Sequence, residues 1–325
     1  PKEMKEGKWA YQGSSAGYNL VLKHKPFLLP WVRKVVEEAR KRHKTLVAFS
    51  HYPLVDFNDG VSEYVRRIWG DRRFDLHRVP EAEVSEAFLQ AGLRLHFAGH
   101  MHVNDTGIWE GKEGKHLYNI QVPSIATYVP AYKILTIESD EVFRVETVTL
   151  DTVPRFDSLF PLYRAEYQSD SLKGHSPVWN KEILSARTYG EFCDYQFRDL
   201  VRLRFIPRDL PESWRACLDF TGAQMLKAVS GKDKSEDTDW TDWCMKDLVL
   251  DLYRLRYAER LALNDIPETR LAAYRYLFDR TRISPLRSTE VEMVNGLGTL
   301  FLAFLNGEPC QNFVIDLEKD TITGY

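Results

Sequence analysis

Hydrophobic and polar positions in the first part of the chain alternate between the spacing of short strands and that of amphipathic helices. Phe27–Lys44 repeats apolar residues at helical spacing. Thr45–Ser50 is a short, almost continuously apolar run, typical of a strand covered on both faces. A second helix is predicted over Glu81–Ala91, ended by Gly92, and a second strand over Leu93–Ala98. Residues of the first helix expected to face inward include Trp31, Val35 and Val36.

This order of elements brings two chain positions to the same place. A strand, a helix and a strand imply a right-handed crossover, so we expect the two strands to lie parallel, with both carboxyl ends at one edge of the sheet. In open α/β sheets, ligands bind at that edge. His51 follows the first strand, and His100 follows the second.

The pattern then changes to shorter runs with alternating polarity. Strands are predicted over His116–Val122, Tyr132–Glu138 and Val142–Thr149, with a hairpin turn between the last two. The first half therefore predicts an α/β (α+β) fold, in which parallel strands run into an antiparallel meander.

The second half of the chain has helical periodicity. Residues 151–180 carry several prolines and no clear period, which predicts a linker between a first domain, 1–150, and a mainly α domain, 181–325. The tail Asn312–Ile322 is expected to form one strand or a small hairpin. The predicted helices are Lys181–Phe205, Pro211–Ser230, Asp242–Leu263, Pro267–Arg282 and Ser288–Leu305.

Composition narrows the classes of function. A net charge of −3 and a pI near 6.4 predict no nucleic-acid-binding patch, and no apolar run is long enough to span a membrane. Four separated cysteines form no CxxC motif and are expected to be buried thiols. Because the chain begins at Pro1, we expect polypeptide upstream of it, and the cellular compartment stays open.

The residues with the clearest chemistry are histidines. Gly99-His100-Met101-His102 places two imidazoles one residue apart, and the glycine is expected to let the backbone turn sharply off the strand. Imidazole is a common ligand for zinc, iron and manganese. With His51 at an equivalent strand end, the sequence predicts a metal site built from His51, His100 and His102. The alternative is that the pair consists of polar loop residues.

Other candidates have simpler explanations. His96, inside a strand, is expected to be a buried histidine with satisfied hydrogen bonds, and Gly70–Asp75 a solvated loop. Asn104 and Asp105 are better explained by a turn than by a role in orienting an imidazole. A set of arginines at 198, 202, 204 and 208 is expected to be a solvated helix face and not a phosphate clamp.

Together these segments resemble a known family over residues 20 to 150. A strand ending in Ser50-His51, a helical crossover, a strand ending in the Gly99–His102 motif and an antiparallel meander are similar to the C-terminal half of the catalytic domain of calcineurin-like metallophosphoesterases. The resemblance implies a half-sandwich fold and a phosphoric ester hydrolase with two divalent metal ions (Mn, Fe or Zn) and a metal-bound hydroxide nucleophile. It also implies that His51 and His100 ligate one ion and His102 the other. Residues 181–325 resemble no family, and we expect a helical accessory domain.

The remaining ligands of that family come from Asp-x-His, Gly-Asp-x-x-Asp and Asn-His motifs, and none of these stands upstream of Ser50. We therefore expect a fragment whose upstream half comes from the same precursor or from another chain, and which is inactive alone. Two alternatives stay open. One is a non-catalytic binding module with a degenerate metal site, and the other is a mononuclear metal hydrolase. The phosphoester substrate is not specified by the sequence.

Overall fold

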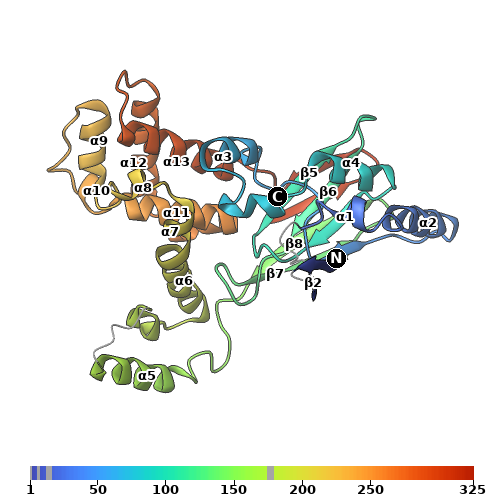
Figure 1. Ribbon diagram of the computed structural model, residues 1–325, viewed down its shortest axis with the longest axis horizontal. Coiled ribbons are helices and arrows are strands. Elements are labelled where there is room, and N and C mark those ends of the chain that lie inside the picture. The colour runs from blue at the N-terminus through green and yellow to red at the C-terminus, as the bar shows by residue number, and fades with distance from the viewer. Residues whose placement is uncertain (1, 6–7, 12–16, 174–178) are drawn as a thin grey trace. The chain divides into compact units, whose positions relative to one another are not determined.

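The computed structural model describes residues 2–5, 8–11, 17–173 and 179–325. The chain forms two compact units, each treated by itself below. The sheet unit comprises Pro1–Val122, Lys133–Thr147 and Gly307–Tyr325, and the helical unit comprises Pro123–Tyr132 and Val148–Asn306. The protein is thus a mixed α/β protein with a mixed four-stranded sheet, an antiparallel four-stranded sheet and a largely helical C-terminal region (Figure 1).

The mixed sheet of the sheet unit has the strand order β3-β4-β6-β5. Strands β3 and β4 run parallel with Ser50 opposite Ala98, which confirms the predicted parallel pairing of the two strands. Strand β6 is parallel to β4, and β5 is antiparallel to β6. Strand β5 was not predicted, and Asp105 begins it instead of lying in a turn. The bounds are β3 Ala48–Ser50, β4 Leu95–Ala98, β5 Asp105–Glu110 and β6 His116–Gln121.

Two predicted helices cover one face of this sheet. Helix α2 is Leu28–Lys41 and α4 is Ala82–Gln90, each close to its predicted bounds, and a short helix α1, Val21–His24, precedes them. Gly92 ends α4 with a φ of 94°, as predicted, and a Cβ there would lie 2.8 Å from a Val36 methyl group. Val36 is buried, but the inward prediction for Trp31 is wrong, because its side chain is 58% exposed. The core on this face contains Val21, Leu54, Val55, Val84, Phe88, Leu89, Leu93 and Leu117.

The segment between β3 and α4 is more ordered than expected. Helix α3, Ser62–Trp69, was not predicted, and a short helical segment η1, Arg73–Arg78, occupies part of the predicted solvated loop. Phe74 and Leu76 are buried in η1, and this burial accounts for the order of that segment.

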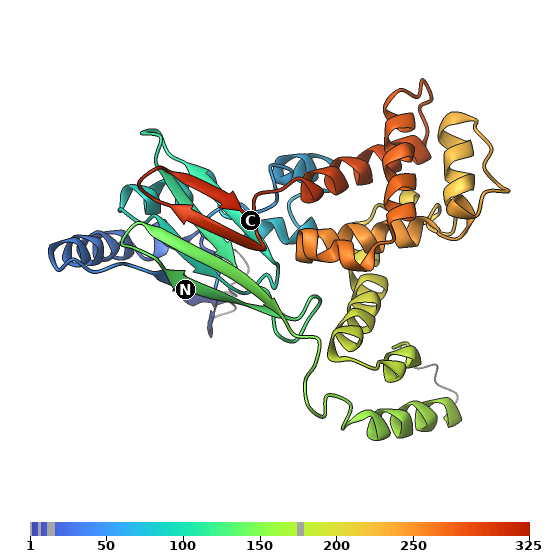
Figure 2. The same cartoon turned by 180° about the vertical axis from the view of Figure 1, so that it is seen from behind.

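The second sheet of the sheet unit is antiparallel, with the order β10-β9-β8-β7 (Figure 2). Its strands are β7 Ala131–Ile137, β8 Val142–Thr149, β9 Asn312–Asp316 and β10 Thr321–Gly324. The two sheets pack through one apolar cluster. That cluster contains Leu95, Phe97, Tyr118, Ile120, Phe143, Val145, Phe313 and Ile315.

The tail of the chain therefore returns to the first unit. It forms a hairpin in which β9 pairs with β8 over Val142–Glu146, so residues 307–325 do not belong with the helices. The predicted division at 150 and 181 differs from the structure at this point. The reason is packing, since Phe313 and Ile315 are fully buried against the strands of the first half.

The helical unit is helical as predicted, but several of the long predicted helices are broken into shorter ones. The predicted linker contains helix α5, Phe160–Leu172, and its residues 174–178 lie outside the described residues. Ser288 accepts a hydrogen bond from the Val291 N–H and so begins α13 as predicted, and Gly231 ends α9 in the left-handed conformation. The predicted helix over 181–205 is broken into η2, α6 and η3, and that over 211–230 into α8 and α9.

The remaining bounds are as follows. In the helical unit they are η2 Lys181–Ser185, α6 Tyr189–Leu200, η3 Val201–Phe205, α7 Ile206–Asp209, α8 Glu212–Arg215, α9 Gly222–Ser230, α10 Thr238–Thr241, α11 Met245–Ala258, η4 Glu259–Asp265, α12 Glu268–Arg282 and α13 Thr289–Leu305. The sheet unit also has a hairpin of β1 Lys2–Lys5 and β2 Lys8–Tyr11. Within the described parts of the chain, no helix has the length and apolar character needed to cross a membrane.

Candidate functional site

Two of the three predicted ligands meet at the carboxyl edge of the mixed sheet. His51 comes directly after β3, and His100 comes two residues after the last residue of β4. Because Ser50 lies opposite Ala98 in parallel register, the two strand ends deliver their following residues to the same point. The juxtaposition therefore follows from the crossover topology.

The two imidazoles are in direct contact. Nε2 of His51 lies 2.7 Å from Nδ1 of His100, and the ring centroids are 4.6 Å apart with an interplanar angle of 70°. The ring of Tyr52 packs against His100 with a centroid distance of 4.2 Å. At this separation one nitrogen donates its hydrogen and the other offers its lone pair, so the rings share an N–H···N hydrogen bond.

The backbone of the motif turns at the histidines and not at the glycine. His100 and His102 both have a φ of 56°, in the left-handed region, whereas Gly99 does not. The Met101 N–H donates to the Gly99 carbonyl at 2.6 Å, which closes a tight turn around His100. A Cβ at Gly99 would meet only the His51 carbonyl, at 3.9 Å, so neither conformation nor space requires glycine there. The predicted role of Gly99 is therefore not what the structure shows.

The surroundings favour the neutral form of these histidines. Burial, together with the positive charges of Arg78, His51 and His102, lowers the pKa of His100 to about 4. Asp75 acts in the opposite direction but does not offset them. Loss of hydration around His102 lowers its pKa as well, as does the nearby His51. A neutral imidazole keeps one nitrogen lone pair for a metal ion or a hydrogen bond.

The second ring nitrogen of His100 differs from the first in its surroundings. Its Nε2 atom is buried and has no hydrogen-bond partner among the described residues. A buried nitrogen without a partner costs free energy, unless an unseen water molecule or ion satisfies it.

The third predicted ligand is close in sequence but does not complete a compact cluster. His102 is exposed. Over the described residues, the ring nitrogens of His51, His100 and His102 do not all lie within 4.8 Å of one another, and no carboxylate joins the first two within that limit. The arrangement thus brings two imidazoles together and leaves the third to one side.

The spacing of the two rings provides a test of whether they fit a metal ion. Nitrogen ligands lie about 2.0–2.1 Å from Zn²⁺, which at a tetrahedral angle places two nitrogens about 3.4 Å apart. The observed 2.7 Å is shorter, so the rings would have to separate by a fraction of an ångström. His51 is exposed, so its side chain has room to move. The two nitrogens could therefore share one divalent ion only after this separation, and the described residues around them do not supply the carboxylates of a dinuclear centre.

His96 agrees with the structural role expected for it. It is buried in β4, its Nδ1 lies 2.7 Å from Asn119 Oδ1, and its Nε2 lies 2.8 Å from Ser50 Oγ. Asn119 Oδ1 also accepts the Leu54 N–H, so it is an acceptor toward His96. Both ring nitrogens are thus occupied within the protein, and His96 has no lone pair left for a ligand.

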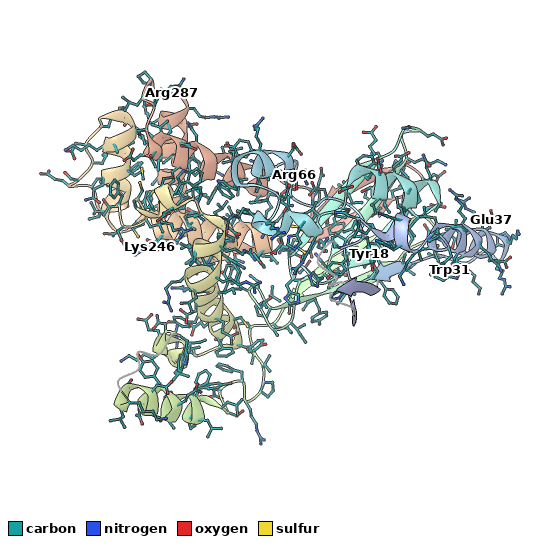
Figure 3. The ribbon with its side chains drawn as sticks, viewed as in Figure 1. Tyr18, Trp31, Glu37, Arg66, Lys246 and Arg287 are labelled. Atoms are coloured by element: carbon teal, nitrogen blue, oxygen red, sulfur yellow. The ribbon has the colours of Figure 1, made fainter. Side chains whose placement is uncertain are left out.

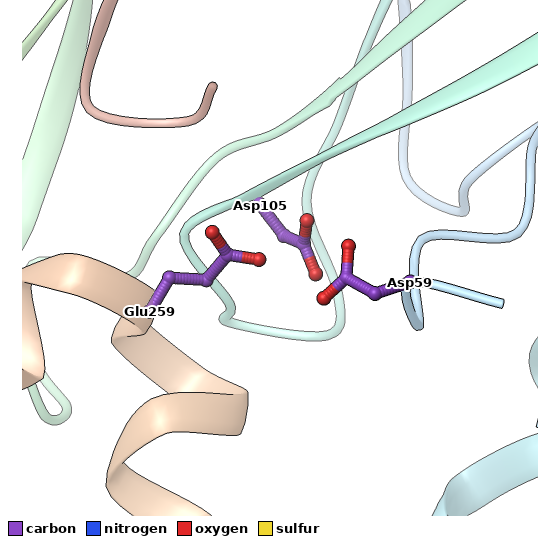
Figure 4. A group of neighbouring side chains, drawn as sticks. All are labelled: Asp59, Asp105 and Glu259. Carbon is purple, nitrogen blue, oxygen red and sulfur yellow. The ribbon is translucent and has the colours of Figure 1, made fainter. Parts of the chain in front are cut away.

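The polar residues after the motif belong to the sheet framework. Asn104 is buried and accepts a hydrogen bond from Lys133 Nζ at 2.5 Å, and Asp105 accepts one from the Thr106 N–H at 2.6 Å. Asp59, which the sequence did not single out, has carboxylate oxygen within 4.8 Å of that of Asp105 (Figure 4). Figure 4 also draws Glu259, a residue of the helical unit.

Two of the four arginines singled out by the sequence, Arg198 and Arg202, agree with a solvated helix face, whereas Arg208 is partly buried and pairs with the buried Asp209 at 2.8 Å. Arg198 pairs with Asp194 at 2.6 Å, and Arg202 pairs with Asp199 at 2.8 Å, each across one turn of helix. The charges of Arg198, Arg202 and Arg208 are thus matched by neighbouring aspartates.

No protein-family model and no curated protein sequence matches the chain.

Proposed function

We propose that the sheet unit is the histidine-bearing half of a calcineurin-like metallophosphoesterase, a hydrolase of phosphoric esters. The observation that carries the proposal is the contact between His51 and His100 at the carboxyl ends of two parallel strands, with a buried Nε2 on His100 that lacks a partner. The resemblance of the Ser50-His51 and Gly99–His102 segments to that family supports it.

The proposal gives each histidine a part. His51 and His100 would bind one divalent ion (Mn, Fe or Zn), and His102, further along the same turn, would bind a second. Two such ions supply a water of lowered pKa and neutralise charge on the phosphoryl oxygens. The turn around His100 holds its ring against Tyr52, and the low pKa of His100 keeps it neutral and able to donate a lone pair at neutral pH.

The proposal also requires metal ligands besides His51, His100 and His102. Three neutral imidazoles leave the charge of two dications uncompensated, and Arg78 adds a further positive charge near His100. We propose that the bridging carboxylate and the leaving-group acid come from polypeptide outside the 325 residues. The chain alone should then bind metal weakly and hydrolyse phosphoesters poorly or not at all.

Metal titration tests the ligand assignment. Calorimetry with Zn²⁺ and with Mn²⁺ should detect at most one ion per chain, with affinity at least tenfold lower in His100→Ala because the variant removes one of two converging donors. His24→Ala, which removes an exposed histidine of the same unit, is the matched control and should bind like the parent. Equal affinity in parent and His100→Ala would contradict the assignment.

A hydrolysis assay tests the activity. The chain should turn over neither bis-p-nitrophenyl phosphate nor p-nitrophenyl phosphate with added Mn²⁺, and should gain activity when the missing carboxylate-bearing half is co-expressed. Robust turnover by the chain alone, abolished in His100→Ala and with one ion bound, would instead favour a mononuclear hydrolase. Absence of any metal binding by the folded chain would favour a binding module.

A further inference from the structure

The helical unit contains a cavity of about 480 Å³ between α5 and α6. Its walls are formed mainly by α5, η2, α6 and residues 126–128, all of which belong to this unit. The side chains that these helices carry are drawn in Figure 3. Cavities that hold small organic molecules have volumes of about 300–1,000 Å³, so this one is large enough for such a ligand.

Contacts at two points hold α5 against its neighbours. The ring centroid of Phe160, which is buried at the start of α5, lies 5.6 Å from that of Phe192 in α6. One turn further along, Arg164 Nη2 donates a hydrogen bond to the Leu184 carbonyl of η2 at 3.1 Å. The wall that α5 contributes to the cavity is therefore fixed both by packing and by hydrogen bonding.

Aromatic side chains form much of the wall of this cavity. They are Tyr163 of α5, Phe192 and Phe197 of α6, Tyr128 and Trp179. Phe197 and Tyr128 are buried and stack on each other with their centroids 4.8 Å apart, whereas Tyr163 is 37% exposed, so solvent reaches the cavity beside it. Aromatic rings attract cations through the negative charge on their faces. The wall thus favours an apolar or a cationic ligand.

The charged side chains at the cavity are acidic. Glu166 of α5 and Asp199 of α6 line it, and the described lining residues include no lysine, arginine or histidine. Asp199 is already paired, because Arg202 lies 2.8 Å from its carboxylate and the Asn180 N–H donates to it at 2.7 Å. Glu166 forms no ion pair or hydrogen bond with any described residue. Its carboxylate is therefore the negative charge at this cavity that a ligand is left to balance.

Two further polar side chains at the cavity are uncharged. The hydroxyl oxygen of Thr127 is buried and has no hydrogen-bond partner among the described residues, which costs free energy that a polar group of a ligand would recover. Burial raises the pKa of the Cys193 thiol to about 11, so this thiol is neutral and adds no charge. The cavity thus combines a carboxylate and an unsatisfied hydroxyl with a wall that is largely aromatic.

We infer that this cavity binds an organic cation, a substituted ammonium ion whose charge is balanced by Glu166 and whose apolar groups contact the rings of Tyr163 and Phe192. A hydroxyl or carbonyl group on such a ligand would satisfy Thr127. The cavity belongs to the helical unit, whereas His51 and His100 belong to the sheet unit, so the inference is independent of the proposed hydrolysis.

Other classes of ligand fit this cavity less well. An anion would meet two carboxylates and no basic side chain of the described lining. A metal ion requires several converging ligand atoms, and the described residues bring no three histidine, cysteine or carboxylate ligand atoms together at this cavity. A neutral apolar molecule would contact the rings but leave the charge of Glu166 unbalanced. An organic cation uses both the rings and the carboxylate.

Two compounds of the same shape test the inference. Choline is the probe, and the control is 3,3-dimethyl-1-butanol, in which a carbon atom replaces the charged nitrogen. Saturation-transfer difference NMR on the full chain, followed through the methyl signal of each compound, should show saturable binding of choline. The control should bind at least fivefold more weakly, because it lacks the charge that the rings and Glu166 attract. Choline binding should also weaken as the salt concentration rises.

Two pairs of variants locate the binding. Glu166→Gln keeps the shape of the side chain but removes its charge, and it should weaken choline binding at least fivefold. Asp157→Asn, which removes an exposed charge just before α5, is the matched control and should bind like the parent. Tyr163→Leu should weaken binding at least threefold because it removes a ring from the wall, whereas Tyr163→Phe keeps the ring and should not. Each of these positions is exposed, so circular dichroism should show that all four variants stay folded.

Three outcomes overturn the inference. Equal binding of choline and 3,3-dimethyl-1-butanol would show that the cavity accepts apolar groups without regard to charge. Binding of neither compound would show that the cavity takes no small organic cation of this kind. Choline binding that Glu166→Gln and Asp157→Asn weaken equally, or that neither weakens, would place the cation elsewhere on the chain. None of these results depends on metal, so they leave the proposed activity to its own test.

Discussion

His96 and His100 lie four residues apart on the same strand and turn, yet their surroundings give them different roles. Both ring nitrogens of His96 form hydrogen bonds inside the sheet, to Asn119 and Ser50. His100 uses one nitrogen toward His51 and has no partner for the other within the described residues. The hydrogen-bond partners, and not the residue type, separate the structural histidine from the candidate ligand.

Burial of His96 gives the stability of the sheet unit a pH dependence. Burial lowers the pKa of His96 to about 4 from its usual 6.5. The unfolded chain therefore takes up a proton near pH 6.5, whereas the folded chain resists protonation until about pH 4. The contribution of His96 to the free energy of unfolding is fully present above pH 6.5. It is lost as the pH falls from 6.5 toward 4, by up to about 3 kcal/mol. Urea unfolding at a series of pH values measures this loss.

Two variants isolate the contribution of His96. His96→Gln should reduce the dependence between pH 6.5 and 4, because an amide does not titrate there, while the lowered pKa values of His100 and His102 leave part of it in place. His24→Gln, at an exposed position, should keep the dependence of the parent. A parent and a His96→Gln variant with equal slopes would rule out His96 as the source.

At the residue scale, sequence logic predicted that His51 and His100 would be neighbours, because parallel strands align their carboxyl ends. It did not predict the left-handed φ of His100 and His102, since local hydrogen bonds such as Met101 to Gly99 decide that conformation. It also missed Asp59, which lies in a loop with no periodic pattern.

Helices α6, α11 and α12 of the helical unit are joined by one buried ionic network. Asp251 of α11 is fully buried and binds Arg254 and Arg270, each at 2.9 Å, and it also accepts the hydroxyl of Tyr274 at 2.9 Å. Arg254 in turn binds Asp194 of α6 at 2.6 Å. The network fixes how the three helices align.

Removal of its central carboxylate should destabilise the helical unit strongly. Asp251→Ala leaves two arginines without their shared anion in a buried position, a change that costs about 3–5 kcal/mol. Chemical denaturation followed by circular dichroism at 222 nm measures it. Asp219→Ala is the control, because Asp219 and its partner Lys246 are 83% and 53% exposed, and it should cost less than about 1 kcal/mol. Similar losses in the two variants would contradict the assignment of the network as the stabilising element.

At the element scale, the sequence predicted those helices and strands whose periodicity is strong, such as α2, α4, α12 and α13. It missed β5, in which Asp105, Thr106 and Gly107 are all buried and the polar–apolar alternation is lost. It also missed α3, which is short and follows a loop. It joined segments over 181–205 that Ala186 and Arg187 separate, because helical periodicity alone does not mark short irregular breaks.

At the scale of the whole molecule, the larger segment of the helical unit, Val148–Asn306, is an insertion between two neighbouring strands. Strand β8 ends at Thr149 and β9 begins at Asn312, yet the two strands pair in one sheet. A linear division of the sequence cannot detect this return, because pairing of β8 with β9 depends on contacts between residues far apart in the chain. Only the hairpin-like pattern of the tail indicated a strand there.

The tail should therefore control the stability of the sheet unit and not that of the helical unit. Phe313→Ala removes a fully buried ring from the cluster between the two sheets, which costs about 3–5 kcal/mol. Differential scanning calorimetry should show a lower transition temperature for the sheet unit and little change for the helical unit. Leu286→Ala, at an exposed position, should change neither. A selective loss of the helical transition in Phe313→Ala would contradict the observed pairing.

The insertion also affects the order in which the chain can fold during its synthesis. Once β8 has left the ribosome, its partner β9 is still roughly 160 residues away. At about 5–20 residues per second, the edge of β8 waits roughly 10–30 s for its neighbour, long enough for the helices between them to fold first. During that interval Phe143 and Val145 lack the tail that covers them, so the newly made chain should depend on chaperones until its last 20 or so residues emerge.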